Sequence, residues 1–251
     1  MVKTTWPQGV ARHILPQVDS TNAHALRLAA DLGGPAWFLG LTQTAGRGRR
    51  ARAWASPPGN FHATLLTFPQ GPATAVALRS FATALALRDA FVALTHLPTS
   101  FRLKWPNDVL LDDQKVAGIL LESTGSGSMI SHLAIGVGVN LIAAPAPEFL
   151  DPGALPAISL LQGTGLKITP ETFLNALAPA YAHWEDVLIT EGFGPLRAEW
   201  LSNAVRLGET ITARTGTATH RGRFETIDLQ GNLILRTSHD TLAIPAADVF
   251  F

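Results

Sequence analysis

The stretch from Phe101 to Leu141, FRLKWPNDVLLDDQKVAGILLESTGSGSMISHLAIGVGVNL, decides the fold because it holds several short strands in close succession. Its strand-like runs are residues 101–104, 109–111, 116–122 and 130–141. The turns between them contain Pro106, Asp112, Asp113 and the Gly/Ser-rich segment 125–128. Apolar runs separated by such turn residues are typical of neighbouring strands. The stretch therefore predicts three or four short strands in a row.

Helices and further strands are predicted on the N-terminal side of this stretch. Residues 11–18 have the composition of a short strand, and the helix-capping residues Asp19-Ser20-Thr21-Asn22 stand before a helical run at 23–32. Gly33-Gly34-Pro35 then ends that helix. We further predict strands at 37–42 and 61–68, a loop at 43–60 and a long Ala/Leu-rich helix at 73–94.

The C-terminal side changes character twice. A Pro/Ala-rich connection at 143–156 leads into helical sequence up to about residue 202, where Trp184 and Trp200 are expected to face the core. From Leu207 onward the chain has short strands and Gly/Asp turns, the pattern of a β-barrel or β-sandwich of about 45 residues, a size that seldom folds alone. The sequence therefore predicts two domains, residues 1–204 and 205–251.

Composition narrows the classes of function. The chain has 251 residues, 47% of them apolar, and it contains 19 Lys+Arg, 19 Asp+Glu and no cysteine. Proteins that hold a polyanion usually carry a basic excess, so we expect no nucleic acid as the main partner. Disulfides, thiolate metal sites and cysteine nucleophiles are excluded. Neither a signal peptide nor an apolar run of about 18 residues is present, so we expect a soluble, cytoplasmic protein without membrane contact.

An arginine-rich loop, Gly46-Arg47-Gly48-Arg49-Arg50-Ala51-Arg52-Ala53-Trp54, is the first candidate for a site. Its spacing formally fits the dinucleotide fingerprint G-x-G-x-x-A, but it runs into Ser56-Pro57-Pro58-Gly59, which cannot begin the required helix. Guanidinium groups bind phosphate and carboxylate through paired donors. We therefore expect a mobile loop that covers anionic oxygens and is disordered without a ligand. A solvated basic loop is the alternative.

Three further segments carry candidate polar groups. The first, Lys104-Trp105-Pro106-Asn107-Asp108, forms a rigid corner that can present its amide and carboxylate to a cleft, or it is an ordinary strand-ending turn. In Lys115-Val116-Ala117-Gly118-Ile119-Leu120 a lysine begins an apolar strand, and the glycine within it often marks close approach of a ligand or a backbone. Alternating glycines in Gly136-Val137-Gly138-Val139-Asn140 leave room for a flat ring, or they belong to a tightly packed central strand.

Taken in order, these segments resemble the biotin protein ligases. The resemblance rests on DSTN at 19–22, GRGRR at 46–50, KWPND at 104–108, KVAGIL at 115–120 and GVGVN at 136–140, and it covers about residues 10–250. It implies an α+β fold with a mixed β-sheet flanked by helices, as in class II synthetases and lipoate ligases. The C-terminal segment is similar to the small SH3-like β-barrel that ends these enzymes. Only 18 residues precede Asp19, too few for a helix-turn-helix, so we expect the monofunctional form.

The resemblance implies a ligase reaction in two steps. Biotin and ATP, with Mg²⁺, would form biotinyl-5'-AMP and pyrophosphate. A lysine of a biotin carboxyl carrier domain, part of a biotin-dependent carboxylase, would then take the biotinyl group and release AMP. Because two anions must meet in the first step, the site needs arginine, lysine and Mg²⁺ for charge compensation. Many members of the family are homodimers, so a homodimer is a further expectation.

The family's roles transfer to matching positions of this chain. The ureido end of biotin would contact Ser20, Thr21, Asn22 and Gln43. Loop residues Arg47, Gly48 and Arg49 would cover biotin and its adenylate, while Lys115, with Gly118 nearby, would bind the biotin carboxylate. This makes Lys115, Arg47 and Arg49 the expected catalytic residues. The expected ATP-binding residues are Arg49, Arg50, Arg52, Trp54, Lys104, Asn107 and Asn140. Asp108 would bind Mg²⁺ or orient the acceptor lysine.

Two other functions are possible for this sequence, and it departs from the family pattern at one position. A lipoate or octanoate ligase would share the architecture, but the arginine loop and the Ser-Thr-Asn segment favour biotin. A non-enzymatic binding module, with the loop on nucleic acid, is disfavoured by the neutral net charge. Ala51 stands where the family pattern commonly has glycine, which would make a positive φ costly there.

Overall fold

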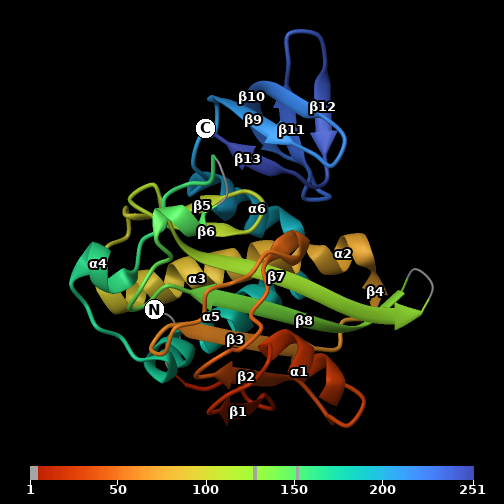
Figure 1. Ribbon diagram of the computed structural model, residues 1–251. Helices are drawn as coiled ribbons and strands as arrows, with labels where there is room; N and C mark the ends of the chain where they lie inside the picture. The colour runs from red at the N-terminus through yellow and green to blue at the C-terminus, as the bar shows by residue number, and fades with distance from the viewer. Residues whose placement is uncertain (1–4, 127–128, 151–152) are drawn as a thin grey trace.

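The computed structural model describes residues 5–126, 129–150 and 153–251. Two sheets organise them, a large mixed sheet and a small antiparallel one, with helices on both faces of the first (Figure 1). No helix in the described part of the chain has the length and apolar character needed to cross a membrane.

The large sheet has eight strands in the order β1-β2-β3-β8-β7-β6-β5, with the short β4 paired to β8. Only β1 and β2 run parallel, and every other pair is antiparallel, so the sheet is mixed as expected. The bounds are β1 Ala11–Leu15, β2 Ala36–Gly40, β3 Phe61–Thr67, β4 Gly71–Pro72, β5 Phe101–Lys104, β6 Asp108–Leu111, β7 Gln114–Ser126 and β8 Met129–Val139.

Helices cover the two faces of this sheet unequally. On one face, α1 packs over a small cluster of Ala25, Ala29 and Phe38. The other face, behind the sheet in Figure 1, carries α3 and α5 and the main hydrophobic core. The bounds are α1 Thr21–Leu28, α2 Ala73–Ala77, α3 Arg79–Thr95, α4 Leu160–Thr164, α5 Pro170–Thr190 and α6 Phe193–Ser202, with 3₁₀ turns at Arg49–Ala51 and Pro147–Phe149. The α1 face therefore carries less helix than the face with α3 and α5.

Local signals explain where these helices begin and end. Ser20 caps α1 through its side chain, so the helix begins two residues earlier than the predicted run at 23–32. The predicted helix 73–94 is divided at Leu78 into α2 and α3. Thr169 caps α5, whose first residue is Pro170, the position that proline favours. Trp200 is buried as expected, while Trp184 is partly buried and donates to Asp89.

The C-terminal β domain is confirmed as a five-stranded antiparallel sheet in the order β12-β11-β10-β9-β13. Its strands are β9 Thr210–Arg214, β10 Thr219–Ile227, β11 Leu233–Arg236, β12 Thr241–Ile244 and β13 Asp248–Phe250. The domain sits beyond the β5–β6 end of the large sheet, at the top of Figure 1. Trp105 reaches it through a 3.1 Å hydrogen bond from Nε1 to the Gly231 carbonyl.

Candidate active site

A row that contains three glycines crosses the α1 face of the large sheet. Pairing aligns Gly40 with His62, His62 with Gly138, Gly138 with Gly118, and Gly118 with Asp108. Residues opposite one another in paired strands point to the same face, and a Cβ on Gly40 would meet Thr21 of α1. The glycine row, here Gly40, Gly138 and Gly118, therefore leaves a strip of the α1 face with few side chains of its own, called the trough below, with His62 within it and Asp108 at one end.

The indole of Trp54 lies in this trough. A Cβ at Gly138 would overlap the indole ring, and one at Gly118 would stand 3.2 Å from it. Lys115 Nζ lies 5.6 Å from the centre of the same ring, within the range of a cation–π contact. The sequence left open whether the alternating glycines admit a flat ring, and in the structure they do.

The N-terminus of α1 forms a buried polar cluster beside the trough. Gln43 Oε1 accepts hydrogen bonds from Thr21 N at 2.8 Å and from Thr21 Oγ1 at 3.1 Å. Thr64 Oγ1 contacts Thr21 Oγ1 at 2.8 Å and Asn22 Oδ1 at 2.6 Å, and Asn22 Nδ2 donates to Glu122 at 2.8 Å. Ser20 is 4% exposed and caps the helix. The structure thus brings together the four residues predicted at the ureido end.

A compact charge cluster lies at the other end of the trough. Lys115 Nζ contacts Asp108 Oδ1 at 2.6 Å, and Lys104 Nζ stands 3.7 Å from Asp108 Oδ2. Burial alone raises the pKa of Asp108, but Lys115, Lys104 and Arg49 outweigh it and hold the pKa below its ordinary value. Desolvation lowers the pKa of Lys104, which Asp108 opposes only in part. Asp108 is therefore an anion held between two ammonium groups.

This surrounding disfavours the predicted role of Asp108 as a Mg²⁺ ligand. Mg²⁺ is bound in proteins through carboxylates and phosphates, and cations next to such a ligand repel it. Within residues 5–126, 129–150 and 153–251, no group of three or more His, Cys, Asp or Glu residues could hold a metal ion. Among the described residues, Asp108 already pairs with two lysines and therefore does not fit the predicted role of a resident Mg²⁺ ligand.

The arginine loop folds back on itself over this end of the site. Gly48 N donates to the Arg52 carbonyl at 2.8 Å, and Trp54 N donates to the Gly46 carbonyl at 2.9 Å. On one side, Arg47 Nη2 pairs with Glu122 at 3.1 Å. These bonds draw residues 46–54 into a short hairpin, and the expected disorder of this loop without a ligand stays a prediction.

The remaining arginines of the loop reach toward the C-terminal domain. Arg49 Nη1 donates to Asn107 Oδ1 at 3.2 Å and to the Ala247 carbonyl at 3.3 Å. Arg50 Nη1 and Arg52 Nη2 both contact Asp248 Oδ2, at 2.6 and 2.9 Å. Desolvation lowers the pKa of Arg49, and Asp248 and Asp108 oppose that shift. Each arginine of the predicted set therefore has a defined contact.

The backbone of the loop differs from the expectation at one point. The positive φ falls on Arg50, at 55°, and not on Ala51. A non-glycine residue in the left-handed region costs about 1 kcal/mol or more, so the surrounding contacts must hold it there.

Asn140, predicted to bind ATP, is buried and bonded to the backbone. Its side chain is 3% exposed, and Nδ2 donates to the carbonyls of Ile158 at 3.3 Å and Lys115 at 3.5 Å. Asn140 thus fixes the backbone at the start of β7. Asn140 is linked to the site by its hydrogen bond to the Lys115 carbonyl.

Sequence reasoning missed four residues of the site. His62 and Thr64 lie two apart on β3 and so share the face of the glycine row. Glu122 and Asp248 supply the carboxylates for the loop arginines. The alternation of β3 could have revealed the first two, whereas no local pattern distinguishes Asp248 from other acidic residues.

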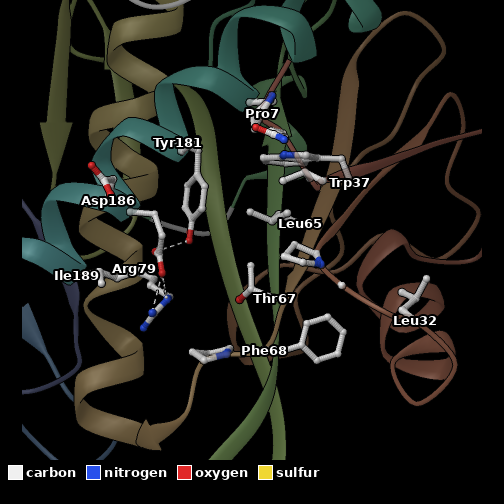
Figure 2. Close-up of a pocket in the computed structure, with 18 of the residues that line it drawn as sticks. Pro7, Leu32, Trp37, Leu65, Thr67, Phe68, Arg79, Tyr181, Asp186 and Ile189 are labelled. Carbon is white, nitrogen blue, oxygen red and sulfur yellow. Dashed lines mark hydrogen bonds and ion pairs between the residues drawn. The ribbon is translucent and has the colours of Figure 1, made fainter. Parts of the chain in front are cut away.

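A cavity of about 760 Å³ lies on the opposite face of the sheet, away from these residues (Figure 2). Trp37, Leu65 and Tyr181 line it, and they belong to the main core beneath α5. Within it, Glu185 accepts hydrogen bonds from Arg79 at 2.6 Å and from Tyr181 at 2.9 Å, whereas the buried Thr67 Oγ1 has no hydrogen-bond partner among the described residues. This cavity is therefore separate from the trough.

The chain is similar to known proteins in both of its parts. Residues 15–140 match the Biotin/lipoate A/B protein ligase family, and residues 207–251 match the Biotin protein ligase C terminal domain. A biotin--[acetyl-CoA-carboxylase] ligase of Paracoccus denitrificans is 53% identical over 95% of this chain and 99% of the relative. The bifunctional ligase/repressor BirA of Bacillus spizizenii is 31% identical over 82% of this chain and 63% of the relative.

A solved structure gives the same fold. The biotin protein ligase from Aquifex aeolicus in complex with biotin and ATP aligns with a TM-score of 0.79 at 23% identity, over 95% of this chain and 97% of that one. The fold agrees across both domains, and the relative at 53% identity extends the likeness along nearly the whole sequence. The chain therefore belongs to the biotin/lipoate A/B protein ligase family and, within it, to the biotin protein ligases.

Proposed function

We propose that this protein activates biotin with ATP and transfers the biotinyl group to a lysine of a biotin carboxyl carrier domain. In the first step a biotin carboxylate oxygen bonds to the α-phosphorus and pyrophosphate leaves. In the second step the lysine ε-amine, having lost a proton, bonds to the acyl carbon and AMP leaves. The relative named for acetyl-CoA carboxylase supports a carboxylase as the source of the acceptor.

The position of Lys115 supports this proposal most directly. Its ammonium group lies at the edge of the glycine row, next to Gly118, with a Cβ there standing 3.4 Å from Nζ. The glycines carry no side chains, so a flat bicyclic ring can lie against them as the Trp54 indole does, and a carboxylate at its end would meet the ammonium group. Without that countercharge, a carboxylate entering a poorly hydrated site would be costly.

The arginine loop would supply the remaining charge compensation. ATP brings three phosphates to a carboxylate, and preorganised cations lower the barrier to their approach. We propose that Arg47 and Arg49 cover biotin and its adenylate, and that Gly48 lets the loop backbone come close to them. Arg50, Arg52 and Lys104 would bind the phosphates. Trp54 and Asn107 would contact the nucleotide side, and Asn140 would act through the backbone of Lys115.

The uncharged end of biotin would meet the polar cluster at the start of α1. Hydroxyl and amide groups both donate and accept hydrogen bonds, as a ureido ring does. Ser20, Thr21, Asn22 and Gln43 are the proposed contacts. Mg²⁺ is proposed to enter as a complex with ATP, since Asp108 is held by two lysines.

Several coarser expectations are also proposals. We place the domain boundary at residues 204/205 and the reaction in the cytoplasm, where ATP and carboxylases meet. The homodimer that the resemblance implies can be tested by sedimentation velocity of the purified chain.

The decisive experiment measures pyrophosphate release from Mg·ATP with biotin, lipoate or octanoate, each with and without a carrier domain. Release that depends on biotin, followed by covalent label on the carrier lysine, is the expected result. Turnover with lipoate alone would transfer the protein to the lipoate branch of the family. No release with any of the three acids would reject the enzymatic proposal.

A further inference from the structure

The C-terminal domain contributes one carboxylate to the arginine loop. Asp248 Oδ2 is shared by Arg50 Nη1 at 2.6 Å and Arg52 Nη2 at 2.9 Å. The adjacent Ala247 carbonyl accepts from Arg49 at 3.3 Å. Two consecutive residues of one domain therefore bind three of the loop arginines of the other.

Asp248 is the fixed partner in this arrangement. Its side chain is 14% exposed, against 41% for Arg50 and 49% for Arg52. It begins β13, where pairing with Arg214 of β9 holds its backbone in the sheet, and Ala247 before it is fully buried. The longer and more exposed arginine side chains adapt to the position of the carboxylate.

The domain that carries Asp248 is itself attached by partly buried hydrogen bonds. Trp105, in the corner between β5 and β6, donates to the Gly231 carbonyl at 3.1 Å. Arg197 of α6 donates to Thr226 Oγ1 at 2.8 Å and to the Ile227 carbonyl. These contacts give Asp248 a defined position relative to the large sheet.

The backbone of the arginine loop also needs stabilising contacts from outside the loop. Arg50 adopts the left-handed conformation at φ 55°, which a residue with a Cβ avoids unless its surroundings compensate. The same residue makes the 2.6 Å contact with Asp248. Arg50 is thus both the residue with the strained backbone and a residue that Asp248 holds. The ion pair can therefore compensate for the strain.

We propose that Asp248 is a positioning residue: it orients Arg50 and Arg52 so that their guanidinium groups face the phosphates of ATP. This inference rests on the proposed ligase function. A guanidinium group has five donors in a fixed plane, so one contact with a carboxylate orients it while it binds a phosphate. The C-terminal domain thereby forms part of the nucleotide site without touching ATP through this side chain.

Asp248→Asn and Asp248→Ala test the proposal through steady-state pyrophosphate release. We expect KM for ATP to rise about tenfold, with kcat and the biotin affinity measured without ATP changing less than about threefold. Asp248→Glu retains the charge and is expected to recover part of the ATP affinity. A KM for ATP equal to that of the unchanged protein would overturn the proposal.

A double-mutant cycle separates positioning from a general structural role. If Asp248 acts through the two arginines, Asp248→Ala adds less than about twofold to KM for ATP in an Arg50→Ala/Arg52→Ala background. A full, additive effect in that background would overturn the proposal. Glu225→Ala is the matched control, because Glu225 pairs with Arg236 at 2.8 Å inside the same domain and leaves the loop contacts intact.

Hydrogen exchange of residues 46–54 keeps the test independent of turnover. Asp248→Ala is expected to speed exchange in this segment about tenfold or more, while Glu225→Ala leaves it unchanged. If the unchanged protein releases no pyrophosphate with biotin, the ligase function fails, and exchange still decides whether Asp248 anchors the loop. Unchanged exchange in Asp248→Ala would overturn the anchor itself.

Discussion

The ammonium group of Lys115 is held at the edge of the glycine row by a short contact with Asp108. Its Nζ lies 2.6 Å from Asp108, and its side chain is 31% exposed. Asp108 in turn stays ionised despite its burial because two lysines flank it, and its pKa is lowered. A carboxylate of a substrate can approach this ammonium group because solvent still reaches it.

Lys115→Ala should therefore remove most of the first-step rate. We expect biotin-dependent pyrophosphate release to fall about 100-fold, because one preorganised charge facing the reacting carboxylate is lost. Stopped-flow detection of pyrophosphate measures this rate. Lys167→Ala, a change at an exposed lysine outside the site, is the control and should have no effect. A near-normal rate in Lys115→Ala would assign the role to another residue.

His62 makes the stability of the fold sensitive to acid. Burial lowers its pKa to about 4 from an ordinary 6.5, and the nearby Gly40 backbone opposes the shift only in part. The unfolded chain binds a proton at higher pH than the folded one, so the stabilising term is complete above about pH 6.5 and is lost as pH falls toward 4. In the described part of the chain, neither ring nitrogen makes a hydrogen bond of ordinary geometry.

His62→Phe removes this dependence. Between about pH 7 and pH 4, the free energy of unfolding should fall by roughly 3 kcal/mol more in the unchanged protein than in the variant. Urea denaturation at both pH values measures the difference. Equal losses in the two proteins would show that His62 is not the group responsible.

At the scale of elements, β8 shows how glycine spacing creates a surface. Gly136 and Gly138 share one face, and they admit the side chains of Asn22 and Trp54. Valines on the alternate positions bury themselves in the core on the other face. One strand therefore closes the core and leaves the trough open.

Gly138→Ala tests this arrangement. The added methyl group would overlap the Trp54 ring, so the indole must leave the trough and the hairpin 46–54 must shift. We expect exchange of the loop amides to rise about tenfold, together with a loss of biotin-dependent pyrophosphate release. Gly194→Ala is the matched control, since a Cβ there meets open space. Unchanged exchange in Gly138→Ala would mean that Trp54 does not depend on this contact.

For the whole molecule, charge pairing decides what the arginine loop can bind. The net charge is zero, and Arg47, Arg50 and Arg52 contact carboxylates of Glu122 and Asp248. A basic patch neutralised in this way attracts a polyanion weakly.

We accordingly expect no oligonucleotide binding tighter than about 10 µM at physiological salt, the range of non-specific contacts. Fluorescence anisotropy with a labelled duplex and a labelled single strand measures it. Tight binding that weakens steeply with salt would instead support a nucleic-acid role for the loop.

Sequence alone determined the features that depend on neighbouring residues. Capping by Ser20 and Thr169, the turns of the 101–141 stretch and the two-residue period of β8 act over a few positions, so their effects can be read directly. The five motifs also sufficed to indicate the family, because their order and spacing are specific. The helix ends, the division at Leu78 and the length of β1 were less predictable, since packing competes with local preference there.

Only the tertiary structure decided which charged groups meet. Arg52 and Asp248 are 196 residues apart, and nothing in the local sequence of either names the other. The same holds for Trp54 on Gly138 and for Asp108 between two lysines, which replaced a predicted metal ligand with an ion-pair partner. Coulomb and contact energies depend on distance through space, and that distance exists only after the two sheets have folded and packed.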